Sequence, residues 1–352
     1  MAGGASTRLW PKSRLAVPKW ALRFGSERSL LQCAWDRAAA VAPAANILAV
    51  TSPDQADLLR ESLPDMPPEN CLVEPAMRDT AGCIALATGV VMSRNPAGVM
   101  LILPGDHVIK PISAFAECAR KAARVAEETQ RLVAIGIAPR GPATCYGYIH
   151  RGEPLPGYGP PMPAFAIESF REKPDEKTAR GYVASGAYYW NAGIFAWTAT
   201  AIMEEFRRQL PEHAEAVRQF AAAGPLGLDA AAITNYPKMR KISIDYGVME
   251  GAAQAAVVEA DFEWDDIGSW SAAKAHMASD SAGNSLQGNI LQLDSEGCLV
   301  ITDPKKQAVI IGVRDLAIIE TPDAIRVCPL SKDQEVKRAV EELRRLGRGA
   351  YL

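Results

Sequence analysis

The chain has 352 residues, of which 48% are hydrophobic and 22% charged, and its formal net charge is −3. This composition is typical of one large α/β domain, or of a large domain with a smaller one. The slight negative charge argues against a nucleic-acid-binding protein, because such proteins depend on Lys and Arg to neutralise phosphates.

The seven cysteines form no CxxC pair, and several stand in apolar runs. We therefore expect buried, reduced thiols rather than disulfides or zinc ligands. The sequence has neither the pattern of a signal peptide nor an apolar stretch of about 18 residues. These features predict a cytoplasmic protein with no membrane partner.

The first residues form a glycine-rich segment that is typical of a phosphate-binding loop. Gly3 and Gly4 allow a tight turn and a close approach of the backbone to a phosphate. Ser6 and Thr7 add hydroxyl groups, and Arg8 adds a planar positive charge. The segment matches neither the Walker motif nor G-x-G-x-x-G, so by itself it indicates only that a phosphate binds nearby.

Helices and apolar strands alternate over the next hundred residues. Continuous Val/Ile/Leu strands separated by helices predict a parallel sheet covered on both faces. Ligands bind beyond the carboxyl ends of such strands, where Glu74 and Asp106 stand. The expected helices are residues 29–42, with Ser29 as N-cap, 54–63, 80–94 and 114–128, and the expected strands are 47–50, 71–73, 99–103 and 132–137.

The last seventy residues change character. Short strands at even spacing, separated by turn residues, predict a compact all-β unit followed by one helix. A polar stretch at 279–284 marks the boundary, so we expect domains at 1–283 and 284–352. The expected strands are 289–293, 298–302, 308–311, 316–320 and 324–327, and the expected helix is 333–346.

Three acidic residues are candidate metal ligands. Asp106 follows a buried strand, and Asp265 and Asp266 stand together in a Trp-rich segment. Carboxylates that meet at a sheet edge suit Mg²⁺, which is bound by one or two carboxylates together with phosphate oxygens. The alternative is structural: Asp106 caps the next turn, and Asp265 caps a helix that begins near Ser269.

Two basic residues stand out from the ordinary surface lysines and arginines. Arg8 lies inside the glycine-rich segment, and Lys173 lies in a Pro-stiffened turn after an apolar strand. Charge-assisted hydrogen bonds to phosphate are the expected use of both. No histidine or cysteine has the spacing of a metal ligand or of a catalytic nucleophile.

Six segments of the chain form a recognisable combination: residues 3–11 with Pro18-Lys19, 74–81, 103–107, 146–149, 170–175 with 190–195, and 244–250 with 264–270. In combination, they resemble the sugar-1-phosphate nucleotidylyltransferases, and among them the mannose-1-phosphate guanylyltransferases. The resemblance implies a Rossmann-like α/β nucleotidyltransferase domain with a mixed, mostly parallel sheet and a small C-terminal β-helix-like unit.

The resemblance also implies an activity: transfer of GMP from GTP to mannose 1-phosphate, with release of pyrophosphate and with Mg²⁺ as cofactor. The attacking phosphate is already a nucleophile, so no general base is required, and the protein's task is to position two anions and screen their charge. A homodimer is one expected assembly. The alternatives are a transferase for another sugar 1-phosphate or nucleoside triphosphate, and a weakly active or non-catalytic relative that binds nucleotide sugars.

The family's functional residues map onto this sequence position by position. Arg8 and Lys19 would act on the α-phosphate and the departing pyrophosphate, and Asp106 and Asp266 would bind Mg²⁺. The nucleotide would be held by Gly3, Gly4, Ser6, Thr7, Glu74, Arg78, Asp79, Thr80 and Ala81, and the sugar phosphate by Gly147, Glu172, Lys173 and Asn191.

The sequence departs from the family's pattern at three residues and at its beginning. The family usually has Gly at Ser6 and Gln at Trp20, and it often has Asn at Asp79. It also has an apolar strand directly before the glycines, which this sequence does not include. We expect that strand to lie in mid-sheet, so its loss leaves ladder groups unpaired at ~1–3 kcal/mol each and weakens both stability and activity.

Overall fold

The computed structural model describes residues 1–3 and 7–352. By their internal contacts these residues divide into two compact units. The first unit comprises residues 1–2, 34–104 and 109–264, and the second comprises residues 3–33, 105–108 and 265–352. The second unit therefore joins the beginning of the chain to its end, while the boundary at 283/284 remains a prediction.

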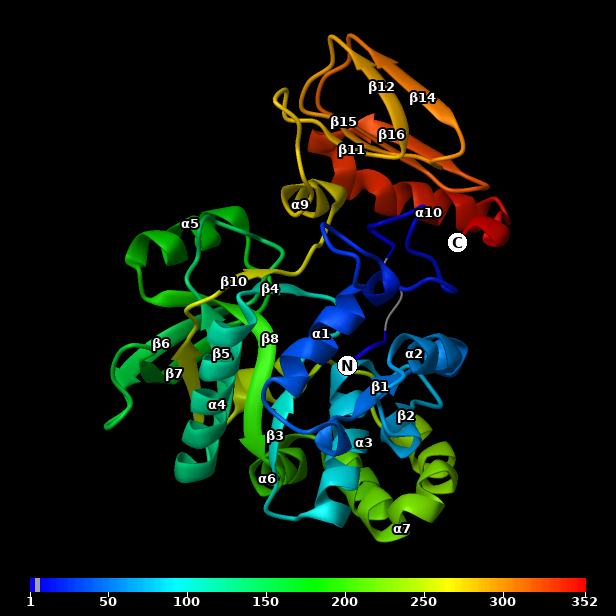
Figure 1. The fold of residues 1–352 in the computed structure, drawn as a ribbon. Helices are drawn as coiled ribbons and strands as arrows, with labels where there is room; N and C mark the ends of the chain where they lie inside the picture. The colour runs from blue at the N-terminus through cyan, green and yellow to red at the C-terminus, as the bar shows by residue number, and fades with distance from the viewer. Residues whose placement is uncertain (4–6) are drawn as a thin grey trace. The chain divides into compact units, whose positions relative to one another are not determined.

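The first unit is built on a six-stranded mixed sheet (Figure 1). The strand order is β3 (Val99–Ile102), β8 (Tyr188–Thr198), β5 (Leu132–Ile137), β9 (Ala255–Glu259), β7 (Ala164–Arg171) and β6 (Tyr148–Pro154). Only β5 and β9 pair in parallel among these strands, and β8 runs antiparallel to β3, β5 and β6. The sheet is mixed as expected, but the expectation of mostly parallel pairing is wrong, because β8 runs antiparallel between β3 and β5 and β7 runs antiparallel between β9 and β6.

A smaller parallel sheet pairs β1 (Ala49–Thr51) with β2 (Cys71–Val73). It is not hydrogen-bonded to the six-stranded sheet through any described strand. The first two residues form hydrogen bonds to both sheets. The Met1 amino group donates to the Leu103 carbonyl, just after β3, at 2.8 Å, and the Ala2 N–H donates to the Val50 carbonyl in β1 at 2.8 Å.

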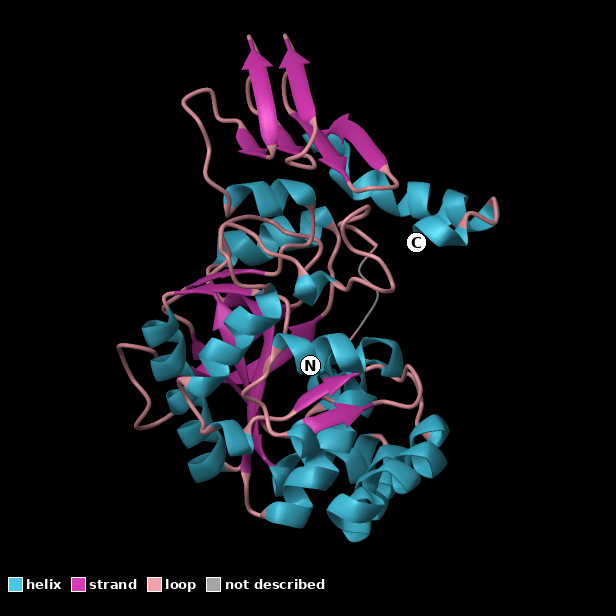
Figure 2. Cartoon of the chain, turned by 45° about the vertical axis from the view of Figure 1, so that its right-hand side comes forward, coloured by secondary structure: helices cyan, strands magenta, loops and turns pink. Residues whose placement is uncertain are grey.

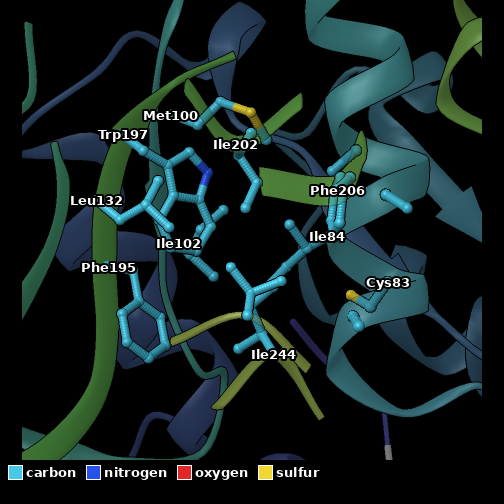
Figure 3. Close-up of a cluster of buried hydrophobic side chains, with 14 of the residues drawn as sticks. Cys83, Ile84, Met100, Ile102, Leu132, Phe195, Trp197, Ile202, Phe206 and Ile244 are labelled. Carbon is cyan, nitrogen blue, oxygen red and sulfur yellow. The ribbon is translucent and has the colours of Figure 1, made fainter. Parts of the chain in front are cut away.

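Helices cover both faces of the six-stranded sheet. On β5, Leu132 and Ala134 face one core while Val133, Ile135 and Ile137 face the other. The first core also takes side chains from α3 (Asp79–Arg94), α6 (Ala199–Gln209) and α7 (Pro211–Asn235), and the second from α4 (Ile112–Thr129) and α5 (Glu176–Ser185). Figure 3 shows side chains of α3 and β8 meeting in the first core.

The expected helices are present, with shifted ends. Residues 29–42 give α1 (Leu30–Ala39), and Ser29 caps it: its Oγ accepts from the Gln32 N–H at 3.2 Å while Gln32 Oε1 accepts from the Ser29 N–H at 3.0 Å. This reciprocal pair is a capping box. Residues 54–63 begin as a 3₁₀ turn and continue as α2 (Ala56–Ser62).

The second unit contains the short strands predicted for the end of the chain (Figure 2). Parallel strands stack in two rows, β11 (Ser285–Gln287), β13 (Leu299–Ile301) and β15 (Leu316–Glu320) in one and β12 (Asn289–Leu293) and β14 (Gln307–Ile311) in the other. This stacking is β-helix-like, and β16 (Ile325–Pro329) closes the first row in antiparallel fashion. The final helix α10 spans Val336–Arg345.

The core of the second unit combines both ends of the chain. Leu9, Phe24 and Leu30 pack with Trp270 of α9 (Trp270–Ala275) and with Ile319 of β15. Leu9 is fully buried. Leu9 thus packs beside the β-helix-like strands within this unit.

Two further short elements complete the fold near the candidate site. Strand β4 (Val108–Lys110) pairs with β10 (Glu263–Asp265), and α8 spans Ile244–Gly247. Within residues 1–3 and 7–352, no helix combines the length and the apolar character needed to cross a membrane.

Candidate functional site

A buried lysine joins the two candidate metal ligands in the second unit. Lys19 is only 7% exposed, and its Nζ donates to Asp106 Oδ2 at 2.8 Å and to the backbone carbonyl of Asp266. Arg8 reaches the same place, since a Cβ built on Gly268 would lie 3.0 Å from Arg8 Nη1 and 3.2 Å from Asp266 Oδ1. Residues far apart in sequence therefore form one cluster of two cations and two carboxylates.

The charges in this cluster keep Asp106 ionised. Burial alone would raise the pKa of Asp106, but the Lys19 ammonium and the neighbouring His107 outweigh it and hold the pKa below its usual value. A buried lysine raises the free energy of the folded state unless its charge is paired, and the ion pair with Asp106 supplies that partner for Lys19.

Asp106 forms an ion pair with Lys19, while its capping of the next turn stays a prediction. The structural alternative for Asp265 is wrong. Asp265 does not cap α9, because Ser269 does so by accepting from the Ala272 N–H at 3.2 Å. Asp265 instead accepts from the Ile267 N–H at 2.7 Å and contacts His276 Nε2 at 3.0 Å. Of the two adjacent aspartates, Asp266 is the one beside Arg8 and Lys19.

A strained residue follows Asp266. Ile267 has a φ of 43°, although β-branched residues rarely adopt the left-handed region. Its side chain is fully buried in the core of the second unit, which holds this conformation in place. Strain of this kind costs on the order of 1–3 kcal/mol and is concentrated at functional sites. Nothing in the local sequence signals it.

In the first unit, Glu74 is held by a tyrosine that no sequence motif indicates. Glu74 follows β2, and the fully buried Tyr236 donates its hydroxyl proton to Glu74 Oε2. Burial raises the pKa of Glu74 against the opposing effect of this hydrogen bond. The carboxylate is therefore fixed at the carboxyl end of its strand.

The turn after Glu74 is bound to a later segment of the chain. Asp79 begins α3 with a φ of 61°, a conformation that Asp and Asn tolerate better than other side chains, and this accounts for both types at this position. Thr80 Oγ1 accepts from the Ile244 N–H at 2.8 Å, and the Ala81 N–H bonds to Ile242. Arg78 donates to the Pro237 carbonyl at 2.5 Å, so part of its guanidinium has a structural role.

The four predicted sugar-phosphate residues come together in the first unit. A Cβ on Gly147 would overlap Glu172 Oε2 and lie 3.4 Å from Asn191 Cβ, so any other residue there would displace the Glu172 carboxylate. Lys173 donates to Glu172 Oε1 at 2.5 Å, and its own φ is 48°. The Glu172 side chain is 10% exposed and that of Lys173 58%, which leaves the ammonium open to a ligand.

A second carboxylate belongs to this cluster and was not predicted. Asp245 of α8 accepts from Asn191 Nδ2 at 2.8 Å. Burial and the nearby Glu172 raise the pKa of Asp245 to about 6. A desolvated carboxylate with a raised pKa next to other polar groups is typical of a binding or catalytic site. The segment 244–250 contributed to the family resemblance, but no local pattern singles out Asp245.

The glycine-rich segment is described in part. Gly3 is exposed, and the Thr7 carbonyl accepts from the Trp10 N–H at 3.3 Å. Gly4 and Ser6 lie outside the described residues.

The residues around Lys19 fit a divalent cation. Asp106 and Asp266 supply only oxygen donors, which hard cations such as Mg²⁺ prefer, and Lys19 contacts both residues at once. Within residues 1–3 and 7–352, no group of three or more His, Cys, Asp or Glu is arranged to hold a metal by itself. Two carboxylates leave coordination positions for substrate phosphates.

Two family models and several known proteins match most of this chain. The nucleotidyl transferase family model matches residues 1–281, and the mannose-phosphate isomerase/GMP-like β-helix domain matches residues 288–343. The xanthan biosynthesis protein XanB of Xanthomonas campestris is 37% identical over 99% of this chain and 73% of its own length.

A mannose-1-phosphate guanylyltransferase of Klebsiella pneumoniae is 36% identical over 100% of this chain and 74% of its own length. A mannose-1-phosphate geranyltransferase from Thermus thermophilus, known by crystal structure, superposes with a TM-score of 0.86 at 34% identity over 98% of both chains. The chain therefore belongs to the nucleotidyl transferase family, and its relatives there include mannose-1-phosphate guanylyltransferases.

Proposed function

We propose that the chain transfers GMP from GTP to mannose 1-phosphate and releases pyrophosphate. A phosphate oxygen of mannose 1-phosphate forms a bond to the α-phosphorus of GTP. The bond from that phosphorus to the bridging oxygen of the β-phosphate breaks, and its electron pair leaves with pyrophosphate. One phosphoanhydride replaces another, so the reaction is reversible.

The observation that carries this proposal is the cluster of Arg8, Lys19, Asp106 and Asp266. Its two cations suit the α-phosphate and the leaving pyrophosphate, because charge-assisted hydrogen bonds to phosphate are strong and a preorganised charge costs no rearrangement during reaction. Lys19 is already held in place by its contacts to both aspartates, so its ammonium is oriented before substrate binds.

Asp106 and Asp266 would hold Mg²⁺. The ion, when bound, screens the phosphate charge and makes the α-phosphorus a better electrophile. The protein's cations also reduce the electrostatic repulsion between the two anionic substrates. No residue has to remove a proton from the nucleophile, since the sugar phosphate is already an anion.

The first unit would bind the remaining parts of the substrates. Glu74, fixed by Tyr236, and the turn at 78–81 serve the nucleoside end. Glu172, Asn191 and Asp245 present acceptors and a donor to sugar hydroxyls, and Lys173 binds the sugar's phosphate. The absence of a Cβ at Gly147 keeps the Glu172 carboxylate in position.

The test is a pyrophosphate-release assay on the full chain with GTP and mannose 1-phosphate. ATP, UTP and glucose 1-phosphate replace each substrate in turn. We expect the highest kcat/KM for GTP with mannose 1-phosphate. No release with any pair would refute the catalytic proposal, and a clear preference for another pair would assign the chain to a different substrate.

Asp266→Ala tests the metal-binding part of the proposal. We expect kcat to fall by roughly 10²–10³-fold, the usual loss on removing one preorganised electrostatic group, while the thermal midpoint changes little. Asp294→Asn in the same unit is the matched control, because Asp294 lies in a turn with a φ of 51°, which Asn tolerates. Near-normal rates for Asp266→Ala over a Mg²⁺ titration would exclude Asp266 as a ligand.

A further inference from the structure

Arg14 lies midway in sequence between Arg8 and Lys19, and its side chain is hydrogen-bonded to the turn between two β-helix-like strands of its own unit. Arg14 Nη1 donates to Asp323 Oδ2 at 2.6 Å, and Arg14 Nη2 donates to Asp323 Oδ1 at 2.7 Å. Nη2 also donates to Thr321 Oγ1 at 3.0 Å. This two-pronged geometry is the strong form of an Arg–carboxylate pair, unlike most single surface ion pairs.

The same guanidinium also orders the segment that carries it. Arg14 Nε donates to the Pro11 carbonyl at 2.9 Å, and the Arg14 N–H donates to the Val17 carbonyl at 2.9 Å. The Arg14 side chain is 14% exposed and that of Asp323 is 43% exposed, so the contact is shielded from water on the arginine side only. One side chain therefore fixes the turn around itself and joins that turn to Asp323.

Asp323 is itself held in a tight turn between β15 and β16. The Thr321 N–H donates to the Ala324 carbonyl at 2.8 Å, and Thr321 Oγ1 donates to Asp323 Oδ1 at 3.1 Å. The hydrogen bonds from Arg14 and Thr321 lower the pKa of Asp323 to about 2, so the carboxylate stays ionised over the working range of pH. The turn thus offers a rigid, permanently charged anchor.

A second contact supports the same segment next to Arg8. Trp10 Nε1 donates to the Tyr351 carbonyl at 2.7 Å, and Trp270 Nε1 donates to the Trp10 carbonyl at 3.2 Å. The end of the chain and α9 therefore hold the segment on one side of Arg14, while the Lys19 ion pair holds it on the other.

We propose that Arg14 and Asp323 are positioning residues for the transfer reaction: they hold the segment between Arg8 and Lys19 so that both cations meet the triphosphate. This rests on the proposed function, in which those two cations act on phosphate. Neither Arg14 nor Asp323 contacts substrate in this scheme. The β-helix-like strands thereby contribute to catalysis through the β15–β16 turn.

The first test is kinetic. In Asp323→Asn, we expect kcat for pyrophosphate release to fall about tenfold or more, because a misplacement of ~1 Å costs up to about a hundredfold. KM for mannose 1-phosphate should stay within about twofold, since Glu172 and Lys173 belong to the first unit. Asp323→Glu keeps the charge and should recover most of the rate.

The second test does not depend on turnover. Amide hydrogen exchange over residues 9–22 of the ligand-free protein should rise at least tenfold in Asp323→Asn and in Arg14→Lys, while exchange over residues 285–301 stays unchanged. Glu296→Gln is the matched control, since Glu296 pairs with Arg314 in the same unit at 2.5 Å and neither residue lies in the segment. It should alter neither kcat nor exchange over residues 9–22.

The outcomes separate this proposal from the proposed function. Unchanged kcat and exchange in Asp323→Asn would overturn the positioning role. A rise in exchange that extends to residues 285–301 would also overturn it, because the pair would then stabilise the unit as a whole. If the parent chain releases no pyrophosphate from any substrate pair, the proposed function fails, and the exchange experiment still decides whether the pair holds the segment.

Discussion

Replacing Asp245 by Asn should stabilise the protein and weaken its binding of sugar phosphate. The pKa of Asp245 is raised from 3.8 to about 6, because burial and Glu172 disfavour its charge. The folded state therefore binds more protons than the unfolded state between these values, and the stability from this group is lost as pH rises through that window. Asn lacks the charge but keeps the oxygen that accepts from Asn191.

The size of the effect follows from the two pKa values. The gain in stability from a neutral residue at position 245 should be below about 1 kcal/mol at pH 4, should grow through pH 5, and should reach on the order of 3 kcal/mol at pH 8, where Asp245 is ionised in both the folded and the unfolded state. Urea denaturation of both proteins at these three pH values measures the difference. KM for mannose 1-phosphate should rise in the variant while KM for GTP stays unchanged.

Two results would refute this reasoning. A stability difference that does not change with pH would mean that Asp245 is not desolvated in the folded state. A variant that is less stable than the parent at pH 8 would mean that the charge is favourable where it stands. Glu172→Gln offers a check on the cause, because removing the neighbouring charge should shrink the gain from Asp245→Asn.

Three further changes test other parts of the site and the fold. Gly147→Ala places a Cβ against Glu172 Oε2, so KM for mannose 1-phosphate should rise about tenfold with little change in KM for GTP. An unchanged KM for mannose 1-phosphate would contradict a role for the contact between Gly147 and Glu172 in binding this substrate. Tyr236→Phe leaves the Glu74 carboxylate without its donor, so urea denaturation should show a loss of ~1–3 kcal/mol and the assay a higher KM for GTP; an unchanged KM would separate Glu74 from the nucleotide. Burial lowers the pKa of His213 from 6.5 to about 4, so the free energy of unfolding should fall by ~3 kcal/mol as pH drops through that window. His213→Gln should flatten this dependence. If the free energies of unfolding of parent and variant change with pH in the same way, His213 is not the group responsible.

Much of the fold could be predicted from the sequence where local signals are strong. The strands at 71–73, 132–137, 289–293 and 316–320 have the predicted bounds, because apolar runs there are bordered by polar or turn residues. Ser29 was identified as an N-cap for the same reason, since its role depends only on its neighbours in the chain.

The direction of strands could not be predicted, because it depends on pairing between distant segments. Nothing within 188–198 indicates that β8 inserts between β3 and β5 and runs against both. Helix α5 precedes β8 and α6 follows it, so the local order of elements favours parallel pairing and does not indicate the antiparallel insertion.

The candidate site was predicted where its residues stand in motifs and missed where they depend on distant partners. Lys19, Asp106 and Asp266 were predicted and do come together. Tyr236 and Asp245 were missed, because the one acquires its role from Glu74 and the other from Asn191, and both partners lie more than fifty residues away.

The residues around the candidate site also share a local cost that the rest of the fold must offset. Asp79, Lys173 and Ile267 each adopt a positive φ, and each lies in a segment that carries predicted ligands. Each such conformation costs on the order of 1–3 kcal/mol, and the charge on Asp245 costs a similar amount. A sequence selected only for stability would remove these costs, since Gly at such φ values and Asn at position 245 relieve them. Gln130, Asp294 and Asp315 share the positive φ outside these segments, so the argument rests on Ile267, whose β-branched side chain makes this conformation costly directly beside Asp266.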